Sequence, residues 1–420
     1  MIAKIIEFSA RNKFLILILT AFLLVGAFWC AHNIRLDAIP DLSDTQVIVY
    51  SRWDRSPDIV EDQVTYPIVT AMLGTPKVKA VRGFSDFGYS YVYVIFEDNT
   101  DLYWARSRVL EYLSKILPRL PEGVKTELGP DATSVGWVYQ YALVDHSGKQ
   151  NLGDLRSLQD WYLRYSLQSV SGVSEVASVG GFEKQYQIQV NPQRLQSFNI
   201  SLMDVIAAVR KSNSESGARV IEFSGFEYMV RTRGYVHSLK DLEAIVVGYD
   251  KLKMAPVLLR HVAKIQLGPE IRRGVTDLDG LGETVGGIVV MRHGENALRV
   301  IERVKARLEE LKPGLPEGVE LIETYDRSGL IKSSIETLTH TLVEEMIVVS
   351  LVILVFLWHS PSAIIPIMTI PISVLLAFIP MYFLGLTSNI MSLAGIAISI
   401  GVLVDGAIVE VENAYKKLQG

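Results

Sequence analysis

The chain has 420 residues, too many for one ordinary domain, and 49% of them are hydrophobic. Its formal net charge of −5 gives no basic field for nucleic acid, so no nucleic-acid partner is expected. The single cysteine, Cys30, excludes a disulfide framework and any metal site built from cysteines within this chain.

The first apolar segment, Phe14–Ala31, contains no charged residue and follows a basic flank. A cleaved signal peptide would have a shorter apolar region and a small-x-small cleavage site, whereas the bulky Phe28 and Trp29 close this segment. We therefore favour a retained membrane-spanning helix, with residues 1–33 forming a cytoplasmic flank and the first span. The basic flank predicts a cytoplasmic N-terminus.

The next stretch, residues 34–133, alternates strand-like and helix-like periods in the order strand, helix, strand, strand, helix, strand. This order predicts a ferredoxin-like βαββαβ unit. The predicted elements are Gln46–Tyr50, Pro57–Leu73, Val78–Phe84, Tyr89–Glu97, Leu102–Leu117 and Val124–Leu128.

A second unit of the same order is split between residues 134–180 and 287–330. The sequence Leu-Pro-Glu-Gly-Val occurs at 120–124 and again at 315–319, at the same helix-to-strand junction of each unit, which argues for duplication. Residues 181–286 interrupt the second unit, and their strand and turn signals predict a small protruding subdomain, with a strand-like stretch at Val257–Leu267. The predicted elements of the second unit are Trp137–Val144, Leu152–Ser169, Val173–Val179, Gly287–Arg292, Ala297–Leu311 and Val319–Thr324.

Three closely spaced apolar segments follow, Val343–Trp358, Ala363–Leu384 and Ile390–Val411. They predict further spans within residues 331–358, 363–384 and 390–413, and a cytoplasmic tail at 414–420 that contains two lysines. Four spans place the large insert outside the cytoplasm. The expected fold class is an α+β membrane protein, either complete with four spans or a fragment of something larger.

Asp405 lies within the last apolar segment, where a carboxylate costs several kcal/mol, ~2.5–3.5 on insertion scales. Such a group is usually paired, protonated or next to a water path; the alternative is that the span is misplaced and Asp405 lies at an interface. A carboxylate among apolar groups favours its neutral form, so it can bind and release protons in a proton-driven carrier. Glu412 follows on the same helical face and is expected at the cytoplasmic boundary, whereas Glu410 faces elsewhere.

Metal ligands are harder to place, because the external part has no His-x-x-x-His, Cys-x-x-Cys or clustered carboxylate motif. Met368, Met381 and Met391 lie in or near the spans. Thioether sulfur suits monovalent copper, but methionine in an apolar helix ordinarily fills space. The chain also contains no phosphate-binding Gly-x-x-x-x-Gly-Lys-Ser/Thr motif and no nucleophile elbow, so no hydrolytic enzyme is expected.

Several sequence motifs are spread over essentially the whole chain: Asp37-Ala-Ile-Pro-Asp-Leu-Ser-Asp44, Gln63-Val-Thr-Tyr-Pro67, Val81-Arg-Gly-Phe84, Tyr91-Val-Tyr-Val-Ile-Phe-Glu-Asp98, Gly129-Pro-Asp-Ala-Thr133, Leu155-Arg-Ser-Leu-Gln-Asp-Trp161, Asn389-Ile-Met-Ser-Leu393 and Val404-Asp-Gly-Ala-Ile-Val409. In these motifs the chain resembles the heavy-metal efflux branch of the resistance–nodulation–division (RND) transporters, and within it the CusA/SilA-type copper–silver pumps. Members of this family are about twice as long, with twelve spans.

The resemblance implies an inner-membrane homotrimer that joins a periplasmic adaptor (membrane fusion) protein and an outer-membrane channel. The two predicted βαββαβ units would be porter subdomains, and residues 181–286 a docking subdomain. Asp405 matches the proton-relay aspartate, whose partners lie in the second half of such pumps, as does the main metal site. No cofactor is implied apart from the metal ion that is the substrate, Cu(I) or Ag(I).

Two positions bear on the substrate. Divalent-cation members carry a second aspartate six residues before the relay aspartate, where this chain has Ser399, which favours the monovalent class. Copper–silver relatives line the membrane channel with methionines, and Met391 matches one, whereas Glu410 stands where another is expected. The alternatives are a divalent-cation pump and a membrane-anchored assembly or adaptor protein without transport of its own.

Overall fold

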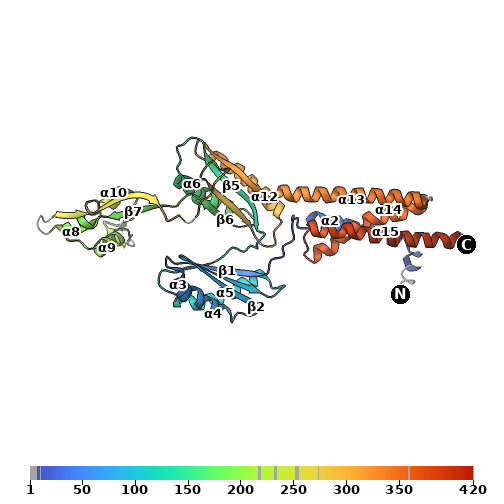
Figure 1. Cartoon of the computed structure of the whole chain (residues 1–420), viewed down its shortest axis with the longest axis horizontal. Coiled ribbons are helices and arrows are strands. Elements are labelled where there is room, and N and C mark those ends of the chain that lie inside the picture. Colours follow the sequence, from blue (N-terminus) through green and yellow to red (C-terminus); the bar gives the residue numbers. More distant parts are fainter. Residues whose placement is uncertain are drawn as a thin grey trace. The chain divides into compact units, whose positions relative to one another are not determined.

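The computed structural model describes residues 7–9, 11–215, 219–230, 234–250, 255–272, 274–357 and 360–419 (Figure 1). The chain divides into two compact units, each described by itself. The first unit comprises Met1–His146, Trp161–Ser178 and Gly286–Gly420, and the second comprises Ser147–Asp160 and Val179–Val285.

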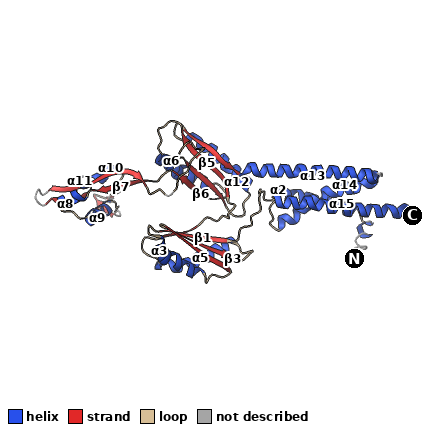
Figure 2. Cartoon of the chain, viewed as in Figure 1, coloured by secondary structure: helices blue, strands red, loops and turns tan. Residues whose placement is uncertain are grey.

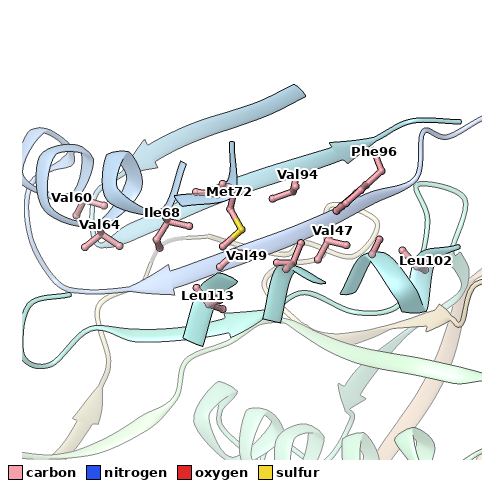
Figure 3. Packing of buried hydrophobic residues seen from close by; sticks show 13 residues of the cluster. Val47, Val49, Val60, Val64, Ile68, Met72, Val94, Phe96, Leu102 and Leu113 are labelled. Atoms are coloured by element: carbon pink, nitrogen blue, oxygen red, sulfur yellow. The ribbon is translucent and has the colours of Figure 1, made fainter. Parts of the chain in front are cut away.

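The first four-stranded sheet of unit 1 has the strand order β2-β3-β1-β4. Side chains of β1 alternate between buried and partly exposed because successive residues of a strand point to opposite faces. The buried valines of β1 and β3 pack against the two helical segments that cover this face, including Ile68, Met72 and Leu113 (Figure 3). Its elements are β1 (Gln46–Arg52), α3 (Pro57–Val60), η1 (Glu61–Thr65), α4 (Tyr66–Met72), β2 (Val78–Asp86), β3 (Tyr89–Phe96), α5 (Leu102–Ile116), η2 (Leu117–Arg119) and β4 (Lys125–Leu128).

The second four-stranded sheet has the strand order β14-β5-β13-β6. If the four strands of each sheet are numbered 1 to 4 in chain order, the second sheet has the spatial order 4-1-3-2. The first sheet, read from β4 to β2, has the same order. The elements of the second sheet and its helices are β5 (Trp137–Asp145), η3 (Gln159–Leu163), α7 (Arg164–Gln168), β6 (Val173–Gly180), β13 (Val285–Met291), α12 (Ala297–Leu311), η4 (Lys312–Gly314) and β14 (Val319–Asp326), and α6 (Leu152–Leu158), which precedes η3 along the chain, belongs to unit 2.

The two repeats also agree in irregular details. The first helix of each contains a π-helical turn, η1 and η3, and the second helix of each ends in a 3₁₀ turn, η2 and η4. Gly123 and Gly318 then adopt φ values of 89° and 85°, a conformation that glycine reaches at no steric cost. These shared features support the predicted duplication, because neither the π turns nor the backbone angles are set by the hydrophobic period.

The described residues of unit 2 form three two-stranded sheets, with short helices between them. The predicted strand-like stretch at Val257–Leu267 is wrong as one element, because Leu259–Val262 forms a helical turn whose Leu259 and Val262 are buried in the core of this unit. The elements are β7 (Lys184–Val190), α8 (Pro192–Phe198), α9 (Leu202–Ser212), β8 (Arg219–Phe223), β9 (Phe226–Val230), α10 (Leu239–Glu243), β10 (Val246–Asp250), β11 (Ala255–Leu258), α11 (Leu259–Val262) and β12 (Ala263–Pro269).

Four long helices complete unit 1: α2 (Lys13–Asn33), α13 (Arg327–Leu357), α14 (Ser360–Phe383) and α15 (Ile390–Gln419) (Figure 2). Among the described residues, α2 and the Ile390–Glu410 part of α15 are long and apolar enough to cross a membrane, and α14 contains a shorter apolar helix. Helix α13 begins directly after β14, well before the predicted apolar segment, and Trp358 at the end of that segment lies outside the described residues.

Candidate proton and metal site on α15

The beginning of α15 is fixed by Asn389, which is 6% exposed. Its side-chain oxygen accepts hydrogen bonds from the backbone N–H groups of Met391 at 2.9 Å and Ser392 at 3.0 Å. The Ser392 hydroxyl in turn accepts from the Asn389 N–H at 2.9 Å. These bonds satisfy backbone groups that the first turn of a helix leaves unpaired, so the motif Asn389–Leu393 defines where α15 starts.

One face of α15 packs against the neighbouring helices. Ile400 and Val404 are buried and cluster with Ile370 of α14 and Met346 of α13, and Ile408 is packed against the same cluster. The α15 positions recur every four residues, the spacing of one helical face. This packing sets the rotation of α15 and therefore the direction of every other side chain on it.

Asp405 is exposed and lies outside this packed face of α15. Large apolar residues on the exposed side of α15 include Met391, Ile398, Val402 and Val409, each between 63% and 76% exposed. No ion pair or hydrogen bond to the Asp405 carboxylate is found within the described part of the chain. The sequence-predicted acid is thus one carboxylate on an otherwise apolar helical stripe.

The other predicted acids differ from Asp405. Glu410 is exposed but, by helical spacing, faces away from the stripe, and the side chain of Glu412 lies outside the described residues. Ser399 donates a hydrogen bond from its hydroxyl to the Ile396 carbonyl at 2.7 Å. The position six residues before Asp405 therefore holds a hydroxyl already satisfied within its own helix.

Met391 is 66% exposed and lines a cavity of about 470 Å³ together with Met291, His293 and Asp41. Thioether and imidazole groups are ligands that suit a soft monovalent cation. The described residues contain no group of three His, Cys, Asp or Glu side chains that could hold a metal ion. Met391 as a metal ligand consequently stays a prediction.

The remaining soft donors have packing roles or point elsewhere. Met381 is 8% exposed and packs with Ile34 and Leu393, and Cys30 is 3% exposed within α2. Met368 is 54% exposed on α14. Of the three methionines found from the sequence, only Met391 lines the cavity.

Sequence reasoning missed a buried ion pair near the start of α15. Arg327 Nη2 lies 2.9 Å from Asp37 Oδ1, and the two side chains are 4% and 12% exposed. Burial raises the pKa of the Asp37 carboxyl, and the opposing effects of the Arg327 charge and of the backbone N–H groups of Ala38 and Ile39 do not cancel it. The available signal was Asp37 itself, in the acidic motif after the first span.

The fold is that of an RND transporter: the chain belongs to the AcrB/AcrD/AcrF family, whose profile matches residues 5–420. It is 54% identical over 420 residues to the cation efflux system protein CusA of Escherichia coli (strain K12), covering 100% of this chain and 40% of that protein. Identity is 53% to the putative cation efflux system protein SilA of Salmonella typhimurium, with the same coverage. The predicted resemblance is confirmed.

More distant relatives support the same family. The chain is 35% identical over 427 residues to the cobalt-zinc-cadmium resistance protein CzcA of Cupriavidus metallidurans, covering 40% of that protein. A crystal structure of a heavy metal efflux pump, crystal form I, superposes with a TM-score of 0.86 at 31% identity, covering 98% of this chain and 41% of that one. The chain thus spans about two fifths of the length of these relatives.

Proposed function

We propose that this chain forms part of a proton-driven pump that exports Cu(I) or Ag(I) across the bacterial inner membrane. The observation that carries the proposal is Asp405, a single carboxylate on an apolar stripe of a helix long enough to span a bilayer. A carboxylate inside a span is costly to keep and commonly marks a proton pathway, which supports Asp405 as the group that carries the proton that drives export. The exposed stripe would face the relay partners, an acid and a lysine contributed by residues beyond this chain.

The proposed topology has four spans, residues 1–33, 331–358, 363–384 and 390–413, with a cytoplasmic N-terminus and tail. The insert then lies in the periplasm, with residues 34–133 and the split segment 134–180 and 287–330 as ferredoxin-like porter subdomains. The strand order 4-1-3-2 in both sheets supports this assignment. Residues 181–286 would form the docking subdomain, in a homotrimer that joins an adaptor protein and an outer-membrane channel.

The choice of a monovalent cation rests on Ser399 and on the relatives. A second carboxylate near Asp405 would suit a harder divalent ion, but Ser399 offers only a hydroxyl that is bonded within its helix. Identity to the protein named CusA is 54%, against 35% to the protein named for cobalt, zinc and cadmium resistance. Met391 is proposed as an accessory ligand, and the main metal site is expected in residues outside this chain.

Metal tolerance of a host that lacks its own copper and silver pump tests the proposal. The native full-length protein, expressed with its adaptor and channel, should raise tolerance to silver and copper but not to zinc or cobalt. Zinc tolerance without silver tolerance would instead assign the protein to the divalent class. Absence of any metal tolerance, with the protein correctly assembled, would favour an assembly role without transport.

A further inference from the structure

The segment after α2 is bonded along the backbone to the start of α15. Leu36 and Ser388 form a parallel bridge, in which Ser388 N–H donates to the Arg35 carbonyl at 2.8 Å and Asp37 N–H donates to the Ser388 carbonyl at 3.1 Å. Ile390 N–H then donates to the Ala38 carbonyl at 3.2 Å. Three backbone hydrogen bonds therefore fix residues 35–38 to the N-terminus of the helix that carries the proposed proton site.

The buried ion pair joins the same segment to the second four-stranded sheet. Arg327 is the first residue of α13 and directly follows the last residue of β14, so its position is set by the sheet. While Nη2 of Arg327 faces Asp37, its Nη1 donates a hydrogen bond to the carbonyl of Val135, two residues before β5 begins. Asp37 and Arg327 thus stand between the start of α15 and two strands of the sheet.

Fold stability alone gives no reason to keep this pair. Burying two charges costs free energy that their attraction often fails to recover, and apolar residues of similar size usually serve a fold as well or better. The raised pKa of Asp37 is the sign that burial is incompletely offset. The charged groups that act on Asp37 are Arg327, which favours its ionised form, and Asp41, which opposes it. Nε and Nη2 of Arg327 form no hydrogen bond with the described residues, so its contact with Asp37 is an ion pair only.

The pair instead constrains the relative positions of the segment at residues 35–38 and the second four-stranded sheet. The ion pair of 2.9 Å draws Arg327 to Asp37 while the hydrogen bond from Nη1 ties Arg327 to the Val135 carbonyl, whereas apolar side chains attract one another only through non-directional packing. Asp405 lies about 22 Å along α15 from Ile390, at roughly 1.5 Å per residue. A displacement of α15 caused by protonation of Asp405 would reach residues 36–38 through the backbone bridge. It would then need a rigid connection to reach the sheet.

We propose that Asp37 and Arg327 are positioning residues that transmit movement of α15 to the second four-stranded sheet during transport. This inference rests on the proposed function and deepens it by naming the mechanical link. The acidic motif that begins at Asp37 then has a role: its first residue ties the membrane helices to the external domain.

The decisive variant replaces both residues, Asp37→Leu together with Arg327→Met, so that no unpaired charge stays buried. The native full-length protein is reconstituted into liposomes, and Ag(I)-dependent proton flux is measured with a pH-sensitive dye. Melting temperature and hydrogen exchange of the first four-stranded sheet report on folding. We expect a folded protein whose flux is at least ten-fold lower. A matched control, Glu283→Leu with Arg272→Met, removes an ion pair of 2.6 Å within unit 2 and should keep full flux.

Full flux in a folded Asp37→Leu/Arg327→Met protein would overturn the proposal, because a merely structural pair tolerates apolar replacement. If that protein fails to fold, Arg327→Lys takes its place, since lysine keeps the charge but cannot contact Asp37 and the Val135 carbonyl as a planar fork does. A several-fold loss of flux in a folded Arg327→Lys protein supports the link, and full flux refutes it. No Ag(I)-dependent flux in the unaltered protein would defeat the proposed function itself.

Discussion

Replacement of Asp405 by asparagine gives the sharpest test of the proton site. Asp405 lies roughly 8 Å inside the Glu410 end of the apolar window Ile390–Glu410, at about 1.5 Å per residue. The cost of the charge there is below the ~2.5–3.5 kcal/mol found at the centre of a span. The amide should therefore stabilise the folded protein by less than about 2.5 kcal/mol, because asparagine is itself polar.

Transport should respond quite differently from stability. An amide of the same shape cannot take up or release a proton, so proton-coupled silver export from liposomes should fall to background in Asp405→Asn. Asp405→Glu should keep part of the activity, because the acid is only displaced by one methylene. Glu412→Gln should cost much less, since this residue is expected at the membrane boundary. An active Asp405→Asn protein beside an inactive Glu412→Gln protein would refute the assignment.

Three further predictions concern topology and stability. A reporter fused at Asn199 should be active only outside the cytoplasm, and a cytoplasmic signal there would contradict the four-span arrangement. Ile68→Ala should lower the free energy of unfolding by about 2–5 kcal/mol in denaturant titration, because Ile68 is fully buried, whereas Leu73→Ala at 62% exposure should cost far less. Burial raises the pKa of Asp326, but hydrogen bonds from Lys305 and Ser328 and the Lys305 charge outweigh it, so its pKa lies below 3.8. The folded state then favours the ionised carboxylate, so the stability that this carboxylate contributes is present above pH 3.8 and is lost as the pH falls through the lowered pKa. Asp326→Asn should therefore flatten the fall in the free energy of unfolding at acid pH. An unchanged dependence of this free energy on pH would contradict the prediction.

The period of the hydrophobic residues was sufficient to locate most regular elements. Strand β1 was predicted at Gln46–Tyr50 and extends only two residues further, because its alternation is a local property of the sequence. The helical turn at Leu259–Val262 was missed because its conformation is set by packing of Leu259 and Val262 in the core of unit 2, and no local hydrophobic period reveals that packing. The π turns of both repeats were missed for a similar reason, since a π turn does not follow from hydrophobic spacing.

Some residues of the candidate site could likewise be predicted from the sequence, and others could not. Asp405 could be identified from the amino-acid sequence, because a carboxylate inside an apolar segment is rare and easily recognised. The link between Asp37 and Arg327 could not be found, because most of the chain separates the two residues and the acidic motif at Asp37 does not indicate which residue it contacts. Only the folded chain brings the turn after α2 and the start of α13 together. Met391 was predicted from its residue type and family position, and its place beside Met291 and His293 emerged from the fold.

The two repeats differ most at one point, the connection between their second and third strands. In the first repeat, β2 and β3 are joined by the two residues Phe87 and Gly88, with Gly88 at a φ of 75°. In the second repeat, the corresponding strands β6 and β13 are also neighbours in their sheet, but nearly all of unit 2 stands between them. A hairpin turn and a whole folded unit are therefore interchangeable at this position, because both begin and end at adjacent strands. A change in the length of the segment between β6 and β13 therefore leaves the pairing of these two strands unaltered, as long as its two ends stay at adjacent strands.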